Sequence, residues 1–171
     1  MPKDDKKQPE YSPLLFTTTL RSPERIKYFL KVIEKYNDQV LDDNLAIRIM
    51  QDCVKEKIYY SVKAFPEFPD YKEAYHSHDE ITEDMAKKVV TKIKQDHKQR
   101  GFEKGWSSRF KTCFELPRLY GFVWFNEPKY GEEKIKMTNL GKELAKCCEF
   151  ENIPAPWSAE TVSEREQSIF L

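Results

Sequence analysis

The pattern of apolar and polar residues between positions 105 and 137 predicts a helix followed by a hairpin. Apolar residues recur at helical spacing at Phe110, Cys113, Phe114 and Leu116. The hydroxyls of Ser107 and Ser108 are expected to cap the first turn, so the helix should begin near Ser108. Pro117 and Gly121 should end it, because proline disfavours a helical residue before it and glycine tolerates the turn that follows.

The period changes to two after this helix. Residues 122–125 form a β-rich run, residues 128–133 a charged turn, and residues 134–138 alternate apolar residues with lysines. Helix, strand, turn and strand in this order are typical of a winged helix. The polar side of the helix and the turn carry Arg109, Lys111, Arg118, Lys129 and Tyr130.

Two helices are predicted ahead of this region. Residues 22–24 form a typical helix start, and the helix that follows should end near Asn37. Its expected buried residues are Ile26, Phe29, Leu30 and Ile33. A second helix should begin at Asp42 or Asp43. Its expected buried residues are Leu45, Ile49 and Cys53.

A third helix is predicted between these two and the hairpin region. It should open at Ser77 or Thr82, after a polar and aromatic loop over residues 71–78, and reach about Arg100. A short turn bracketed by glycines then joins it to the helix that begins near Ser108. Two helices joined in this way form a helix-turn-helix.

Together these elements predict an α+β fold: a winged helix-turn-helix domain that is mostly helical with a small antiparallel β-wing. We expect a flexible tail over residues 1–13, the winged-helix domain over 14–150, and a linker with the start of a truncated helix over 151–171. Thr138 or Asn139 should cap the helix after the hairpin. Its apolar positions are Leu140, Leu144 and Cys148.

Charge changes this picture locally. The whole chain carries 29 basic and 29 acidic residues, so its net charge predicts no acidic partner. Between Ala86 and Arg118, however, ten basic residues stand against three acidic ones. A basic stripe beside a helix-turn-helix is typical of phosphate binding, whereas the simpler interpretation is a solvated, lysine-rich helix. The four cysteines have no disulfide or metal-site spacing, and no apolar run is long enough to span a bilayer, so we expect a cytoplasmic protein.

Three short motifs stand out along the chain: TTTLRSPERIKYFLKVI at residues 17–33, LYGFVWF at 119–125 and KMTNLGKELA at 136–145. Together they resemble the N-terminal DNA-recognition region of AlwI-type (type IIS) restriction endonucleases and related site-specific nicking endonucleases. The family's Ser-Pro-Arg-Ser-Pro-Glu-Lys type of motif is matched from Leu20 to Arg25, with Leu20 in place of the usual proline. Its Tyr-Gly-Phe-Val strand and following helix are matched by Tyr120 to Val123, Thr138, Gly141 and Leu144.

This resemblance implies a recognition domain built from winged helices. In the family, that domain precedes a separate PD-(D/E)xK cleavage domain, which cuts outside the recognised sequence. Magnesium is therefore expected only for such a cleavage domain or subunit, and no cofactor is expected in this chain. We expect the chain to bind double-stranded DNA without cutting it unaided.

The candidate DNA-binding residues follow from the helix, the hairpin and the motif around Arg21. A helix fits the major groove, where arginine can bond two guanine acceptors, and a wing can contact the backbone or the minor groove. Trp106, Trp124 and Phe125 are assigned to the core. The candidate set is Arg21, Ser107, Ser108, Arg109, Lys111, Thr112, Arg118, Lys129, Tyr130 and Lys134.

Two alternatives stay open from the sequence. A compact magnesium-dependent nuclease would use Asp70, Asp96 and Lys98, but residues 96 and 98 fall in a predicted helix, where side chains two apart point in different directions. A winged helix that binds protein, or that serves a transcription regulator, is the second. His76 and His78 are expected to be solvated, and no catalytic or metal-binding residue is assigned.

Overall fold

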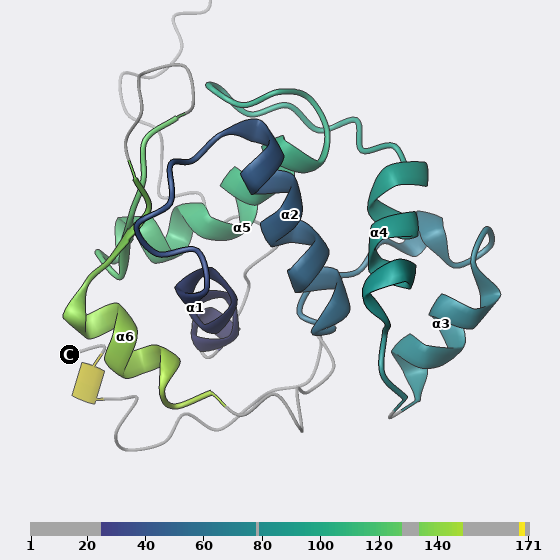
Figure 1. The fold of residues 1–171 in the computed structure, drawn as a ribbon, viewed down its shortest axis with the longest axis horizontal. Coiled ribbons are helices and arrows are strands. Elements are labelled where there is room, and N and C mark those ends of the chain that lie inside the picture. Colours follow the sequence, from purple (N-terminus) through teal and green to yellow (C-terminus); the bar gives the residue numbers. More distant parts are fainter. Residues whose placement is uncertain (1–24, 78, 128–133, 149–167, 170–171) are drawn as a thin grey trace, which may run out of the picture.

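The computed structural model describes residues 25–77, 79–127, 134–148 and 168–169. The described chain is mostly helical and contains a small antiparallel sheet, as the sequence predicts (Figure 1). None of its helices is both long and apolar enough to cross a bilayer. In order, the elements are α1 (Ile26–Glu34), α2 (Asp43–Lys55), the 3-10 helix η2 (Val62–Ala64), α3 (Pro69–His76), α4 (Glu83–Lys92), α5 (Trp106–Leu119), β1 (Val123–Trp124), β2 (Lys136–Met137) and α6 (Asn139–Ala145).

The buried faces of the first two helices form as predicted. α1 begins at Ile26 without a side-chain cap bond and ends at Glu34, before the predicted end near Asn37, and the predicted start at residues 22–24 lies outside the described residues. All the positions expected on the inner face of α1 are buried, as are those expected in α2. Asp42 caps α2, because its carboxylate accepts a hydrogen bond from the Leu45 N–H at 2.6 Å. α1 packs against α2, α5 and α6, and α2 lies between α5 on one side and α4 on the other (Figure 1).

The prediction of a loop over residues 71–78 is wrong, because Pro69–His76 form the helix α3. Pro69 occupies its first turn, where the missing N–H costs nothing. Tyr71, Ala74 and Tyr75 then share one face and are buried. Aromatic contacts hold this face in place, with the Tyr60 and Tyr75 ring centroids 4.8 Å apart. The helix therefore depends on rings from outside it as well as on its own spacing.

The third predicted helix is shorter than expected. Thr82 caps α4 through a bond from the Met85 N–H at 3.2 Å, but the helix ends at Lys92 and not near Arg100. Ile93 already has an extended backbone. Residues 93–105 separate α4 from α5, so the two helices are not joined by the short turn that was predicted. α5 packs mainly against α2, and the predicted helix-turn-helix pair of α4 and α5 is not formed.

α5 differs from its prediction at its start and at Pro117, but it ends before Gly121 as predicted. Its N-cap is Gly105, which has a φ of 111° and makes no side-chain cap bond, so the two serines predicted as caps lie inside the helix. Pro117 lies within the last turns and does not end the helix. The end comes at Gly121, with a φ of 72°. There the Phe122 N–H bonds to the Pro117 carbonyl and the Gly121 N–H to the Arg118 carbonyl, each at 3.0 Å, which is the Schellman pattern.

The segment 134–138 lies between two other extended pieces of chain. On one side β2 pairs antiparallel with β1, in the register Val123 with Met137 and Trp124 with Lys136. On the other side the Ile135 N–H bonds to the Gln39 carbonyl at 2.9 Å, and Val40 forms a bridge with Lys134. The chain between α1 and α2 therefore joins the edge of the predicted hairpin.

Two apolar residues near this sheet were predicted to be buried but are exposed. Trp124 is 56% exposed, and Leu140, in the first turn of α6, also faces outward. Thr138 caps α6 as predicted, because its hydroxyl accepts a bond from the Gly141 N–H at 3.1 Å. Trp106 and Phe125 are buried, as predicted.

Candidate nucleic-acid interface

Three of the predicted DNA-binding residues on α5 are buried inside the fold. Ser107 Oγ donates to Asp43 Oδ1 at the start of α2. Thr112 Oγ1 lies 2.9 Å from His97 Nε2. Ser108 is fully buried, and its hydroxyl has no hydrogen-bond partner among the described residues. These side chains contact protein, and none of them reaches the surface where a DNA base would lie.

The three basic residues predicted on α5 have partners within the chain. Arg109 Nε donates to Gln95 Oε1 at 3.3 Å. Arg118 donates to Glu115 at 2.7 Å. Lys111 forms an ion pair of 2.6 Å with Glu127, and the two side chains are only 14% and 19% exposed. A pair this close and this buried holds the chain after β1 against α5, so the role of Lys111 is structural.

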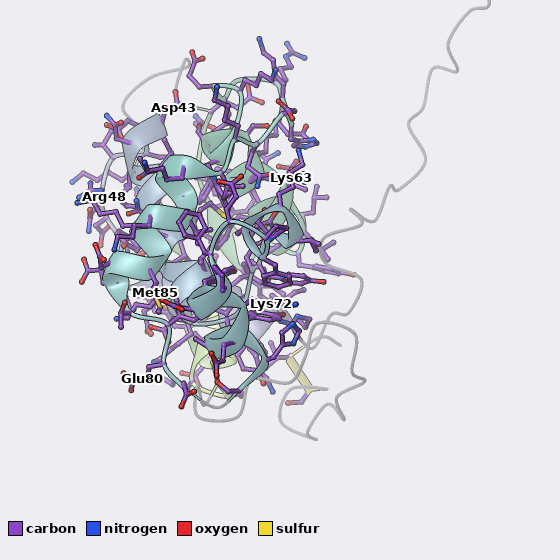
Figure 2. All side chains as sticks on the ribbon, turned by 90° about the vertical axis from the view of Figure 1, so that its right-hand side faces the viewer. Asp43, Arg48, Lys63, Lys72, Glu80 and Met85 are labelled. Carbon is purple, nitrogen blue, oxygen red and sulfur yellow. The ribbon has the colours of Figure 1, made fainter. Side chains whose placement is uncertain are left out.

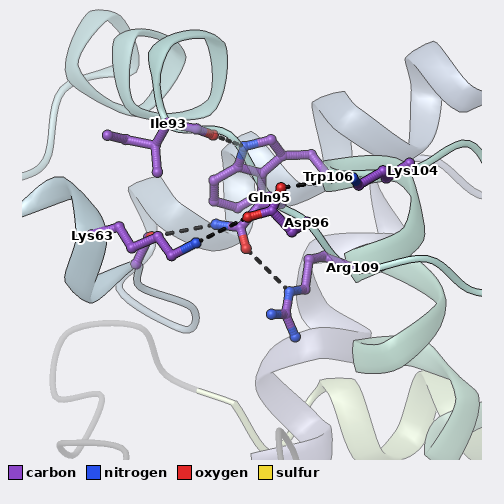
Figure 3. Close-up of polar contacts among 8 residues, drawn as sticks. Lys63, Ile93, Gln95, Asp96, Lys104, Trp106 and Arg109 are labelled. Atoms are coloured by element: carbon purple, nitrogen blue, oxygen red, sulfur yellow. Dashed lines mark hydrogen bonds and ion pairs between the residues drawn. The ribbon is translucent and has the colours of Figure 1, made fainter.

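The segment 93–105 covers the outer side of α5. Trp106 Nε1 donates to the Ile93 carbonyl at 2.9 Å, and Gln95 reaches both Arg109 and Ser61 (Figure 3). Farther along, Lys111 Nζ donates to the Arg100 carbonyl at 3.1 Å. This cover explains why Arg109, Lys111 and Thr112 are bonded within the fold. Ser107 is held instead by Asp43 of α2, and Arg118 by Glu115.

Burial alternates along the start of this segment, as it does along a strand. Ile93 and Gln95 are buried and His97 is half-buried, whereas Lys94, Asp96 and Lys98 between them are exposed. The lysines therefore share the outer side. We call the basic strip the exposed cations of this segment and its neighbours, Lys63, Lys92, Lys94, Lys98, Arg100 and Lys104.

The carboxylate of Asp96 lies within the basic strip. Asp96 bonds to Lys63 at 3.3 Å and to Lys104 at 3.8 Å, which brings η2 and the end of the segment together (Figure 3). Its hydrogen bond with Lys63 and the charges of Lys63 and then Lys104 lower its pKa. All three side chains are exposed, so these pairs contribute little stability and can give way to a phosphate. Lys92, Lys94 and Lys98 form no ion pair with any other described residue.

His97 lies beneath the strip, between the segment and α5. Its Nε2 atom is 3.0 Å from Gln99 Nε2 and 2.9 Å from Thr112 Oγ1. Burial, and then the charge of Arg109, hold the pKa of His97 below its usual value of 6.5. A neutral imidazole is therefore favoured where the segment meets α5.

The remaining predicted residues are elsewhere. Arg21, Lys129 and Tyr130 lie outside the described residues. Lys134 is exposed beside β2 and is not part of the basic strip. The sequence shows the lysines of the strip as a cluster of basic residues. The predicted helix to Arg100, however, would have distributed them around its circumference. The alternation of apolar or amide residues with charged ones at 93–98 was the signal that places them on one side.

The same alternation corrects the argument against a nuclease site. Asp96 and Lys98 do point to the same side, because this stretch is not helical. Asp96 is nevertheless exposed and bonded to two lysines, and Asp70 lies in the first turn of the separate helix α3. Within the described ranges no group of three or more histidine, cysteine, aspartate or glutamate side chains is arranged to hold a metal ion. The site that stands out is the basic strip.

Comparison with protein-family models, with curated proteins and with solved structures gives no match. The resemblance to the recognition region of AlwI-type endonucleases therefore stays a prediction from short motifs. The interpretation of the site rests on its own geometry and charge.

Proposed function

We propose that this chain is a double-stranded DNA-binding domain and that its basic strip contacts the phosphate backbone. The observation that carries the proposal is the set of six exposed cations on the segment that covers α5 and on its neighbours, against Asp96 and Glu103 as acids. Polyanions bind such surfaces by releasing condensed counterions. Lysine contacts to phosphate position a protein on DNA but carry no sequence information.

The order of the elements supports a winged-helix domain with an insertion. α1 is followed by the paired segment at Val40, then α2, α5, β1 and β2. Residues 134–138 lie between the other two extended pieces, as the last strand of a winged helix does. In this interpretation α2 and α5 form the helix-turn-helix pair, and α3 and α4 are inserted between them. The insertion ends in the segment that carries the strip.

This arrangement moves the proposed DNA contacts away from α5. In a winged helix α5 would enter the major groove, but here the segment 93–105 lies over it. Direct reading by Arg109 and Lys111 would require that cover to move, and Arg118 would have to leave Glu115. Phosphate binding by the strip requires no rearrangement.

The specific form of the proposal is a recognition domain of an AlwI-type restriction endonuclease. The motifs at residues 17–33, 119–125 and 136–145 support it. In that family cleavage belongs to a separate domain or subunit, so this chain by itself should bind DNA without cutting it.

The strip is tested by neutralising two lysines that have no ion-pair partner among the described residues. We expect the Lys94→Gln/Lys98→Gln variant to reduce the slope of log K against log salt by about 1.8, since each lost phosphate contact contributes about 0.9. If the two lysines contribute only counterion release, the variant and the natural chain bind equally well at about 1 M salt. At about 0.15 M salt the variant then binds about 30-fold more weakly. Fluorescence anisotropy with labelled duplexes of about 20 base pairs measures both quantities.

The matched control is Lys55→Gln/Lys72→Gln, which removes the same charge from exposed positions on α2 and α3. In Figure 2, Lys72 lies well away from Lys63, which belongs to the basic strip. This control should retain the slope of the natural chain. An unchanged slope in the Lys94/Lys98 variant, or equal losses in both variants, would overturn the placement. Weak, salt-insensitive binding by the natural chain would favour a protein-binding domain instead.

Magnesium in the same titrations tests the nuclease alternative. We expect no nicking of supercoiled plasmid by this chain. Magnesium-dependent nicking that disappears in Asp96→Asn would contradict binding without cutting.

A further inference from the structure

The small sheet leaves a large aromatic side chain exposed. Trp124 in β1 is 56% exposed, whereas its neighbours Val123 and Phe125 are buried. Because side chains alternate along a strand, the two buried neighbours hold the indole on the outer face. Phe125 is anchored by a ring contact with Phe110 at 5.1 Å. Trp124 therefore cannot turn into the core without removing residues that already fill it.

Two lysines flank this indole on the same face. Lys136 lies directly opposite Trp124 in the antiparallel register, and Lys134 follows two residues away, opposite Val40. Both lysines are exposed, while Ile135 and Met137 between and beyond them are buried. Side chains directly opposite in such a pair are about 5 Å apart at Cβ. Neither lysine forms an ion pair with a described residue.

The composition of this face selects among possible partners. The core of a protein–protein interface is depleted in lysine, so an indole between two ammonium groups suits it poorly. Paired bases in a duplex present only their edges, and a flat indole needs the face of a ring. An unpaired nucleotide supplies both requirements, a base for stacking and a phosphate for the lysines.

We propose that the face formed by Trp124, Lys134 and Lys136 binds single-stranded nucleic acid, with an unpaired base stacked on the indole. This surface differs from the basic strip in carrying an exposed indole. The two meet near Arg100, because Lys111 Nζ bonds both to the Arg100 carbonyl and to Glu127, three residues after Trp124. In Figure 1 the strand pair lies on the far side of α5 from α4, which leads into the strip. The inference thus goes beyond duplex binding and does not depend on it.

The test uses the full chain and a labelled oligothymidylate of about 12 nucleotides, which stays unpaired. Removing the ring in Trp124→Ala should weaken binding about 5- to 150-fold, the range for losing one base–aromatic stack. Trp124→Phe retains a ring and should keep most of the affinity. Lys134→Gln/Lys136→Gln should lower the salt slope by about 1.4, because a single-strand contact contributes about 0.7 each.

Two controls separate this inference from the proposed duplex function. Leu119→Ala removes an exposed apolar side chain from the end of α5 and should leave oligothymidylate binding unchanged. Lys94→Gln/Lys98→Gln should weaken duplex binding while binding of the single strand persists. Trp124→Ala should do the reverse. Circular dichroism of each variant confirms that the fold is intact.

The inference is overturned by any of three results. The first is no binding of oligothymidylate by the natural chain at about 50 mM salt. The second is equal affinity of Trp124→Ala and the natural chain for the single strand. The third is a loss of single-strand binding in the Lys94/Lys98 variant as large as its loss of duplex binding, which would mean one shared surface.

Discussion

Gly141 in α6 is the position where the structure makes its sharpest prediction for stability. Its backbone lies against the start of β1, and a Cβ added there would overlap the Phe122 carbonyl oxygen and lie 2.9 Å from the carbonyl carbon. Both neighbours are backbone atoms, which cannot rotate away as a flexible side chain can. Gly141→Ala must therefore push α6 from the strand.

Two opposing effects decide the sign of this change. Alanine favours a helix over glycine by up to about 1 kcal/mol. Overpacking typically costs about 1–3 kcal/mol. Moving α6 also stretches the bonds from the Thr138 N–H and from its hydroxyl to the Phe122 carbonyl, at 3.1 and 3.2 Å, each contributing about 1 kcal/mol. The steric and hydrogen-bond losses exceed the gain, so we expect a net loss of about 2 kcal/mol.

Urea unfolding followed by far-ultraviolet circular dichroism measures this loss in the free energy of unfolding. The control is Lys142→Ala, an exposed neighbour in the same helix, which should stay within about 0.5 kcal/mol of the natural chain. A Gly141→Ala variant as stable as the natural chain, or more stable, would refute the close packing of α6 on Phe122.

Two further predictions concern the covered side of α5. Ser108→Ala should be neutral or stabilising in urea unfolding, because it removes a buried hydroxyl that has no partner among the described residues; a loss above about 1 kcal/mol would reveal a partner. His97 has a lowered pKa in the folded chain, so the unfolded chain takes up its proton first as the pH falls. The free energy of unfolding should therefore decrease below about pH 6.5 and level off below the folded-state pKa. Unfolding midpoints between about pH 8 and pH 5 should show this decrease weakened in His97→Gln, and an identical profile would contradict it.

Local chemistry was enough to predict several elements. The inner face of α1 follows from apolar spacing alone. The caps of α2 and α6 involve Asp42 and Thr138 with N–H groups three residues away, so a few neighbouring letters define them. The end at Gly121 is equally local, because glycine tolerates the left-handed turn. In each case the partner atoms are close in the chain, which is why the pattern predicts them.

Contacts between distant residues decided the remainder. α4 ends early where the Ile93 carbonyl accepts a bond from Trp106, thirteen residues away, and the segment beyond it covers α5. Ser107 and Thr112 are buried, contrary to the prediction, because Asp43 and His97 lie against them. The DNA-binding residues predicted on α5 depended on which of its sides faces solvent, and spacing within one helix cannot specify what packs on it. Trp124 remained outside because Val123 and Phe125 already fill the core beneath it, and only the assembled sheet determines which of three adjacent apolar residues is left exposed.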